Sequence, residues 1–116
     1  MMAYSEPYEA LDEKTRDISR AITSLREELE AIDWYNQRVS TSKDLALKEV
    51  MAHNRDEEIE HAAMTLEWLR RNMGGWDEEL KTYLFSAGSL VEAESGGTEN
   101  SSSTTSSLSI GSLKDK

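Results

Sequence analysis

The sequence predicts an all-α protein whose main element is an antiparallel hairpin of two long helices, followed by a short third helix. Apolar residues recur at helical spacing over two long stretches, and the three-residue segment Ser40-Thr41-Ser42 separates them. The composition agrees, because 37% hydrophobic and 31% charged residues over 116 positions fit one small helix-rich domain. Two long helices joined by so short a segment are expected to fold back on each other.

The first predicted helix begins near Ser5, a suitable N-cap, with Glu6 and Pro7 in its first turn. Its apolar residues are spaced mostly by three, four or seven positions and form one amphipathic stripe: Leu11, Ile18, Ile22, Leu25, Leu29, Ile32 and Val39. After the interruption, Thr41 and Asp44 have the spacing of a capping box that could start the second helix.

The second helix is expected over residues 44–72, and the third over residues 76–85. Arg70 and Arg71 suit the negative end of the second helix dipole, and Gly74-Gly75 is a typical stop. In the third helix, Asp77 precedes Lys81 by four residues, which is the spacing of a favourable ion pair.

Beyond residue 87 the composition changes. We therefore divide the chain into a helical domain (residues 1–87), a flexible linker rich in Gly, Ser and Thr (88–107) and a terminal peptide (108–116). Apolar residues return after this linker at Leu108, Ile110 and Leu113. A short apolar segment after a flexible linker is typical of a docking peptide.

A lone hairpin covers only part of each apolar stripe, so we expect two copies to pair as a four-helix bundle. The absence of cysteine excludes disulfides and thiolate metal sites. A net charge of −10 argues against a nucleic-acid partner, and no apolar run is long enough to span a membrane. Residues 1–11 lack the signature of a secretory signal, so we expect a cytoplasmic protein.

Charged residues lie where the core should be. On a helical projection, Glu28 falls about 20° from Ala21 and Val39, inside the apolar stripe, with Tyr35 close to the same line. Glu27 and Glu30 fall on other sides of the helix. A buried carboxylate is costly unless it is paired or binds a metal, so Glu28 is a candidate ligand.

The second helix repeats this pattern. Glu58 projects toward the apolar side and His61 lies about 60° round, so a carboxylate and an imidazole share one face. With Glu28 they make half of the ligand set of a carboxylate-bridged di-iron site in a four-helix bundle, and a symmetric dimer would supply the whole. A core salt bridge is the structural alternative, with Arg55 about 60° from Glu58 as its basic member.

Three blocks of the sequence together resemble one known family. Residues 27–35 (EELEAIDWY), 54–71 (NRDEEIEHAAMTLEWLRR) and 108–113 (LSIGSL) closely resemble encapsulated ferritins, proteins with a ferritin-like fold that are cargo of encapsulin shells. The resemblance covers essentially the whole chain.

By position, the resemblance implies a ferroxidase that oxidises Fe(II) to Fe(III) with dioxygen and delivers iron for mineral storage. Two irons per dimer would be held by Glu28, Glu58 and His61 of each subunit. Glu27 and Glu30 match an outer metal-entry site, which would also accept other divalent cations. Trp34 matches an aromatic residue beside the entry route, and Tyr35 a residue near the iron centre.

The resemblance also implies partners. The family forms a decameric ring of five dimers inside the lumen of an encapsulin nanocompartment. The segment Leu108, Ile110, Gly111, Ser112 and Leu113 looks like the targeting peptide for that shell. The alternative function is a non-enzymatic coiled-coil adaptor that binds divalent cations as shell cargo, for which the inward placement of Glu28, Glu58 and His61 would have no use.

Overall fold

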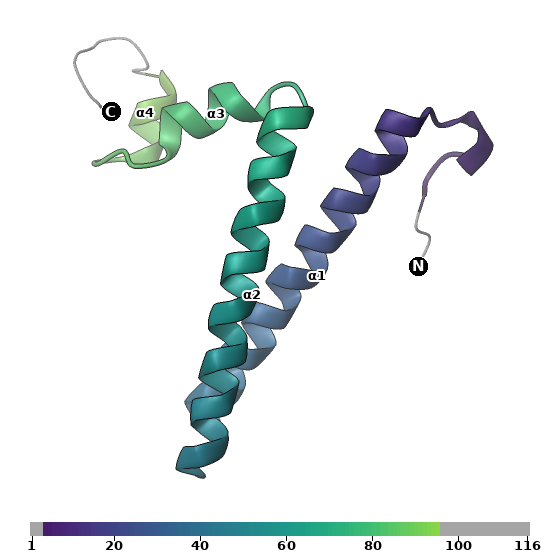
Figure 1. The fold of residues 1–116 in the computed structure, drawn as a ribbon. Helices are drawn as coiled ribbons and strands as arrows, with labels where there is room; N and C mark the ends of the chain where they lie inside the picture. Colours follow the sequence, from purple (N-terminus) through teal and green to yellow (C-terminus); the bar gives the residue numbers. More distant parts are fainter. Residues whose placement is uncertain (1–3, 96–116) are drawn as a thin grey trace. The chain divides into compact units, whose positions relative to one another are not determined.

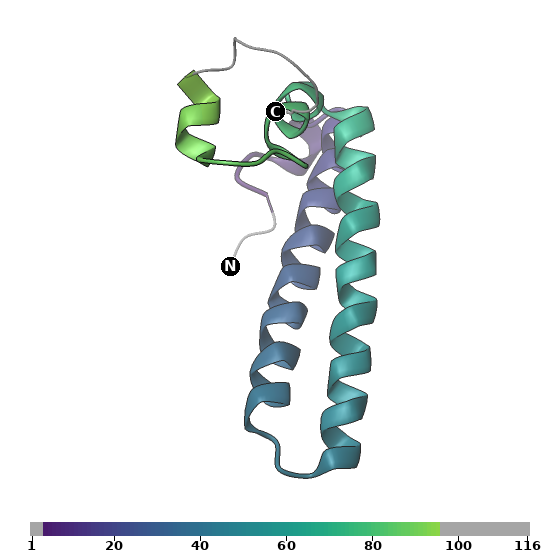
Figure 2. The ribbon, with the colours of Figure 1, turned by 90° about the vertical axis from the view of Figure 1, so that its left-hand side faces the viewer.

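A computed structural model describes residues 4–95. They belong to two compact units, and the division falls between Asn72 and Met73. The first unit is the predicted hairpin (Figures 1 and 2). Helix α1 spans Glu13–Thr41, helix α2 spans Leu45–Asn72, and residues 42–44 form the turn between them. The two helices run antiparallel along most of their length, so the all-α prediction and the hairpin are confirmed.

The start of α1 differs from the prediction. Ser5 is not the N-cap, because a short 3-10 helix, Tyr8–Ala10, lies between it and α1. Asp12 is the N-cap instead, and its Oδ1 accepts a hydrogen bond of 2.8 Å from the Thr15 amide. This bond from the Thr15 backbone lowers the pKa of Asp12, since it stabilises the carboxylate.

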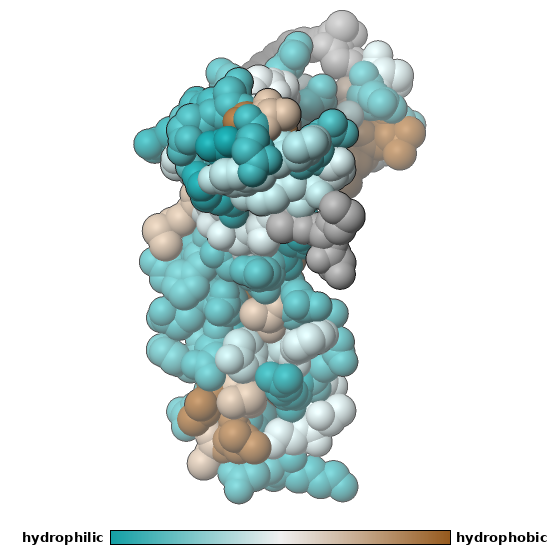
Figure 3. Space-filling model, turned by 90° about the vertical axis from the view of Figure 1, so that its right-hand side faces the viewer, coloured by the Kyte–Doolittle hydropathy of each residue, from teal (hydrophilic) through white to brown (hydrophobic). Residues whose placement is uncertain are grey.

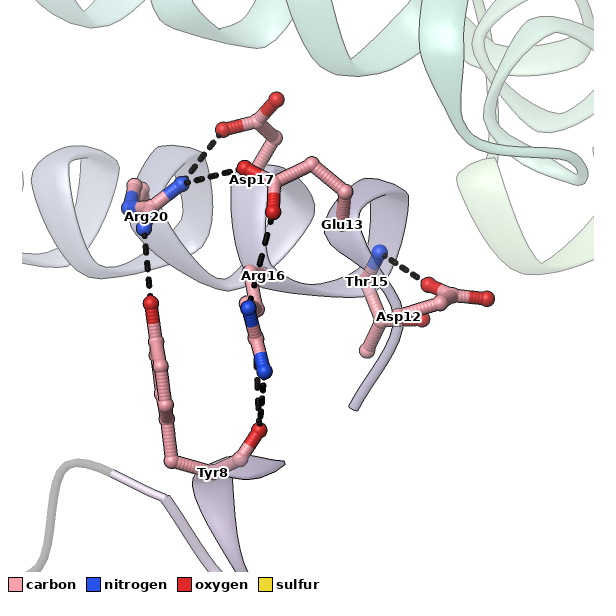
Figure 4. A network of polar contacts seen from close by, with 7 residues as sticks. All are labelled: Tyr8, Asp12, Glu13, Thr15, Arg16, Asp17 and Arg20. Atoms are coloured by element: carbon pink, nitrogen blue, oxygen red, sulfur yellow. Dashed lines mark hydrogen bonds and ion pairs between the residues drawn. The ribbon is translucent and has the colours of Figure 1, made fainter. Parts of the chain in front are cut away.

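Tyr8, in the 3-10 helix before α1, contacts two arginines of α1. The Arg16 guanidinium lies 3.9 Å from the centre of the Tyr8 ring and donates to the Tyr8 carbonyl oxygen at 2.8 Å (Figure 4). Arg20 donates to the Tyr8 hydroxyl at 3.4 Å and pairs with Asp17 at 2.7 Å. These contacts hold the preceding segment against α1 as a separate turn, which the sequence pattern around Pro7 did not predict.

The turn between the helices also corrects one prediction. Asp44, rather than Thr41, caps α2, since its Oδ1 accepts a hydrogen bond of 3.0 Å from the Leu47 amide. Thr41 is the last residue of α1, and its hydroxyl donates to the Gln37 carbonyl oxygen at 3.2 Å. The predicted capping box is therefore wrong, although the short turn and the start of α2 are as expected.

The core of a single copy is small. Among the described residues, only Ala62 and Leu69 are buried apolar residues. Leu45, Leu47 and Val50, near the start of α2, are each at least half exposed. Figure 3 shows a largely hydrophilic face with a hydrophobic group near the turn end of the hairpin. One copy thus leaves much of its apolar surface in water, which favours association with other copies.

The second unit contains two short helices, α3 (Trp76–Tyr83) and α4 (Leu90–Ser95). Helix α3 ends two residues earlier than predicted, and the expected Asp77–Lys81 ion pair is present at 3.0 Å. Helix α4 was not predicted and lies at the start of the segment assigned to the linker. Residues 96–116, including the terminal peptide, lie outside the described residues. Within residues 4–95, no helix has the length and apolar character needed to cross a membrane.

Candidate metal half-site

Glu58 and His61 lie side by side on α2. The His61 Nδ1 atom is 3.5 Å from Glu58 Oε1, and the Glu58 side chain is only 27% exposed. The spacing of three residues on a continuous helix produces this contact, because such residues are neighbours on the helix surface. The predicted grouping of a carboxylate with an imidazole on the inner side of α2 is therefore present.

Glu28 supplies a third candidate ligand from α1. Its side chain is half-buried, and its Oε1 atom is buried without a hydrogen-bond partner among the described residues. A buried carboxylate oxygen without a partner is unfavourable, since ionised groups lose their hydration on burial. A cation would compensate for that loss, which makes Glu28 more than a chance polar residue in the stripe.

A hydrogen bond at the open end of the hairpin indicates at which level these residues lie. Lys14 Nζ donates to Asn72 Oδ1 at 2.9 Å and lies 5.8 Å from the centre of the Trp68 ring. Lys14 precedes Glu28 by 14 positions (28 − 14), and Asn72 follows Glu58 by 14 positions (72 − 58). Because antiparallel helices rise equally per residue, Glu28 and Glu58 reach the same level on facing helices.

The other predicted site residues lie farther out. Glu27 and Glu30 are exposed, as their helical positions predicted, and Trp34 is 49% exposed. Tyr35 is half-buried, with the Arg38 guanidinium 5.5 Å from the centre of its ring. These four side chains lie on α1 within two turns of Glu28.

A single copy does not gather a full ligand set. Over residues 4–95, no group of three or more His, Cys, Asp or Glu side chains is close enough to hold a metal ion. Glu28 and the pair Glu58 and His61 lie on different helices of the hairpin.

Sequence reasoning missed the polar links between the two helices. Besides Lys14 and Asn72, the Arg55 Nη1 atom donates to Asn36 Oδ1 at 3.1 Å, which joins α2 to α1 one turn from Glu58. The one available signal was the position of Arg55 near the inner side of α2. Nothing in the local pattern indicated its partner.

The antiparallel hairpin of two long helices places the chain in the all-α class, with a ferritin-like fold. Residues 3–87 match the model of the EncFtn-like family. The chain belongs to the EncFtn-like family, which confirms the resemblance stated from the sequence.

Two curated relatives support the same assignment. The chain is 58% identical over 100 residues to a "Ferritin-like protein" of Thermotoga maritima, covering 84% of this chain and 88% of the relative. It is 53% identical over 120 residues to the "Encapsulated ferritin-like protein" of Rhodospirillum rubrum, covering 94% and 86% respectively. A crystal structure of a Nitrosomonas europaea protein matches with a TM-score of 0.74 and 58% identity, covering 77% of this chain and 99% of that one.

Proposed function

We propose that this chain is a ferroxidase that oxidises Fe(II) to Fe(III) with dioxygen at a site shared by two copies. The observation that carries the proposal is the buried oxygen of Glu28, which has no hydrogen-bond partner within residues 4–95 and lies on the helix that faces Glu58 and His61. Membership of the EncFtn-like family and the similarity to an encapsulated ferritin-like protein support it.

The residue types suit this chemistry. Paired copies would contribute four carboxylates from Glu28 and Glu58 and two imidazoles from His61. Carboxylates and imidazoles together bind iron and leave coordination positions for dioxygen. The four negative charges offset the charge of two bound Fe(II) ions, which reduces the cost of placing carboxylates in a bundle core. Two bound Fe(II) ions would give one electron each to one dioxygen molecule, which would take up two protons to form hydrogen peroxide, and both iron ions would leave as Fe(III).

Glu27, Glu30 and Trp34 are exposed on α1, and we assign them to the approach of metal ions. Two carboxylates facing water attract cations before the ions reach the inner site. Tyr35, half-buried about two turns from Glu28 on α1, would lie near the iron centre. Other divalent cations would compete for the outer carboxylates, because oxygen ligands accept several metals.

We further propose that the chain assembles as a decameric ring of dimers and works in the lumen of a cytoplasmic encapsulin compartment. The relative from Rhodospirillum rubrum is described as encapsulated, and this chain aligns with it over 94% of its length. Leu108, Ile110, Gly111, Ser112 and Leu113 would bind the shell and deliver the ferroxidase to the place where the mineral forms.

The test is aerobic addition of Fe(II) to the purified full-length protein, with the ferric absorbance and dioxygen consumption followed together. If the protein is a ferroxidase, dioxygen consumption after Fe(II) addition is faster with the unmodified protein than in buffer alone or with the Glu58→Ala protein. An adaptor that merely buffers cations would bind Fe(II) without accelerating its oxidation, and that result would reject the proposed activity.

A further inference from the structure

We propose that Arg55 and Asn36 are positioning residues that hold Glu58 of α2 at the level of Glu28 on α1. The inference rests on the proposed function, since it assigns a role relative to the same half-site. Neither residue is offered as a metal ligand. Their contribution is the relative placement of two helices that each bring ligands.

The geometry of the contact supports this role. Arg55 Nη1 donates to Asn36 Oδ1 at 3.1 Å, across the hairpin, and Arg55 Nε is 3.1 Å from Asp56 Oδ1 on its own helix. The Arg55 side chain is 26% exposed, far less than the Asp56 side chain at 65%. The guanidinium is thus fixed at two points, and a planar guanidinium held at both ends has little freedom to move.

The position of the contact links it to Glu58. Arg55 precedes Glu58 by three residues, so the two side chains are neighbours on the surface of α2. A sliding or rotation of α2 that displaced Glu58 would also break the hydrogen bond from Arg55 to Asn36. The small core offers little other resistance, because its buried apolar residues among those described, Ala62 and Leu69, both lie beyond Glu58 toward the open end.

The positive charge of Arg55 would also reduce repulsion among the carboxylates of the proposed site. Glu28 and Glu58 from two copies bring four carboxylates together, and like charges repel strongly when solvent is excluded. A guanidinium one turn from Glu58 reduces this repulsion before metal arrives. Arginine suits the position because it stays charged and because one N–H group of its planar guanidinium can donate to an amide oxygen.

The hairpin offers a matched control. Lys14 and Asn72 form a second polar link between the same helices, at 2.9 Å, but at the open end. Lys14 precedes Glu28 by 14 positions (28 − 14), so the link lies roughly 21 Å along the helix from the site. If the links acted only through the stability of the hairpin, losing either would have the same effect.

The test compares Asn36→Leu, Arg55→Lys, Asn36→Asp and Lys14→Met in the full-length protein. Asn36→Leu removes the acceptor on the opposite helix, and we expect it to raise the Fe(II) concentration for half-maximal oxidation about tenfold, the loss typical of residues that orient ligands. Arg55→Lys should raise this concentration similarly, because lysine lacks the planar guanidinium that donates to two partners at once. Asn36→Asp keeps an oxygen acceptor and should stay near the unmodified protein.

A second readout needs no metal. The chain has two histidines, so the ring resonances of His61 and His53 can be followed separately by NMR. Asn36→Leu should move the His61 resonance and leave that of His53 in place, although the substitution lies on the other helix. Lys14→Met should leave the His61 resonance in place and the half-maximal Fe(II) concentration within about twofold, since its link lies roughly 21 Å along the helix from the site.

Equal effects of Asn36→Leu and Lys14→Met would overturn the positioning role, as would an unchanged His61 resonance in Asn36→Leu. The proposed function has a separate point of failure. If the unmodified protein oxidised no Fe(II) while Asn36→Leu still moved the His61 resonance, the positioning role would stand and the ferroxidase proposal would fall.

Discussion

The His61 Nδ1 atom lies 3.5 Å from Glu58 Oε1, whereas the same helix carries a similar pair in a different setting, His53 Nε2 at 3.9 Å from Glu57 Oε2. The His61 side chain is 45% exposed and that of His53 is 71% exposed. Both pairs follow from helical spacing, so the spacing alone does not mark a site. What distinguishes the inner pair is its burial, because the Glu58 side chain is 27% exposed whereas that of Glu57 is 52% exposed.

This contrast gives the first prediction. His61→Ala should abolish rapid Fe(II) oxidation, because each iron would lose its imidazole ligand, while His53→Ala should leave at least half of the rate. Glu58→Ala should match His61→Ala. The measurement is the initial rate of ferric absorbance under aerobic conditions. Full activity in the His61→Ala protein would disprove the ligand assignment.

The second prediction separates inner from outer carboxylates. Glu27→Ala and Glu30→Ala should change the rate of iron uptake several-fold while leaving the inner site able to bind, because both side chains are exposed and lie outside the stripe. Crystals of each variant soaked in Fe(II) would show which positions fill. An inner site that stayed empty in either variant would contradict a role restricted to entry.

The third prediction concerns assembly. One copy holds half of the ligand set, so iron should tighten dimerisation, as any ligand does that binds only the assembled state. Native mass spectrometry across an iron titration should show metal mainly on dimers and larger assemblies. Monomers that bound iron as tightly as dimers would refute the shared site, and Glu58→Ala should remove the effect of iron on assembly.

The fourth prediction follows from Glu67. Hydrogen bonds from Arg70, at 2.7 and 2.8 Å, and then from Arg71, at 2.7 Å, lower the pKa of Glu67 to about 2 from its ordinary 4.5. The Glu67 carboxylate therefore binds a proton less readily in the folded state than in the unfolded state. The resulting stability is present above pH 4.5 and is lost as the pH falls through about 2.

Glu67→Gln should accordingly lower the thermal unfolding midpoint at pH 7 and weaken its decline between pH 4.5 and about 2. Circular dichroism melts across this range measure both effects. Glu60→Gln, at an exposed glutamate two turns earlier on α2, is the control that removes a charge without removing this double arginine contact. Identical pH profiles for the two variants would show that the contact contributes nothing.

The fifth prediction concerns the terminal peptide, which lies outside the described residues. Removing residues 108–116 should leave ferroxidase activity in solution unchanged and abolish loading into an encapsulin shell. Weak binding by each short peptide would be strengthened by the several copies on one ring. Co-expression with a shell protein, followed by analysis of purified shells, measures the loading. Equal loading of full-length and truncated chains would show that the address lies elsewhere.

The two long helices and α3 could be predicted from the sequence, whereas the 3-10 helix Tyr8–Ala10 and α4 could not. A helix turns about 100° per residue, so the contact between Glu58 and His61 and the partial burial of Glu28 and Glu58 could be predicted from spacing. The same spacing placed Glu27 and Glu30 outside, as the structure has them. The short segment before Leu45 was enough to predict the antiparallel hairpin, because three residues cannot carry the chain elsewhere.

The capping residues in use and the polar links between the helices depend on how the helices pack. Asp12 and Asp44, not Ser5 and Thr41, are the caps, and for α1 the reason lies in the contacts of Tyr8 with Arg16 and Arg20. The links from Lys14 to Asn72 and from Arg55 to Asn36 join residues 58 and 19 positions apart. No local pattern encodes such pairs, because they exist only once two helices have packed in one register.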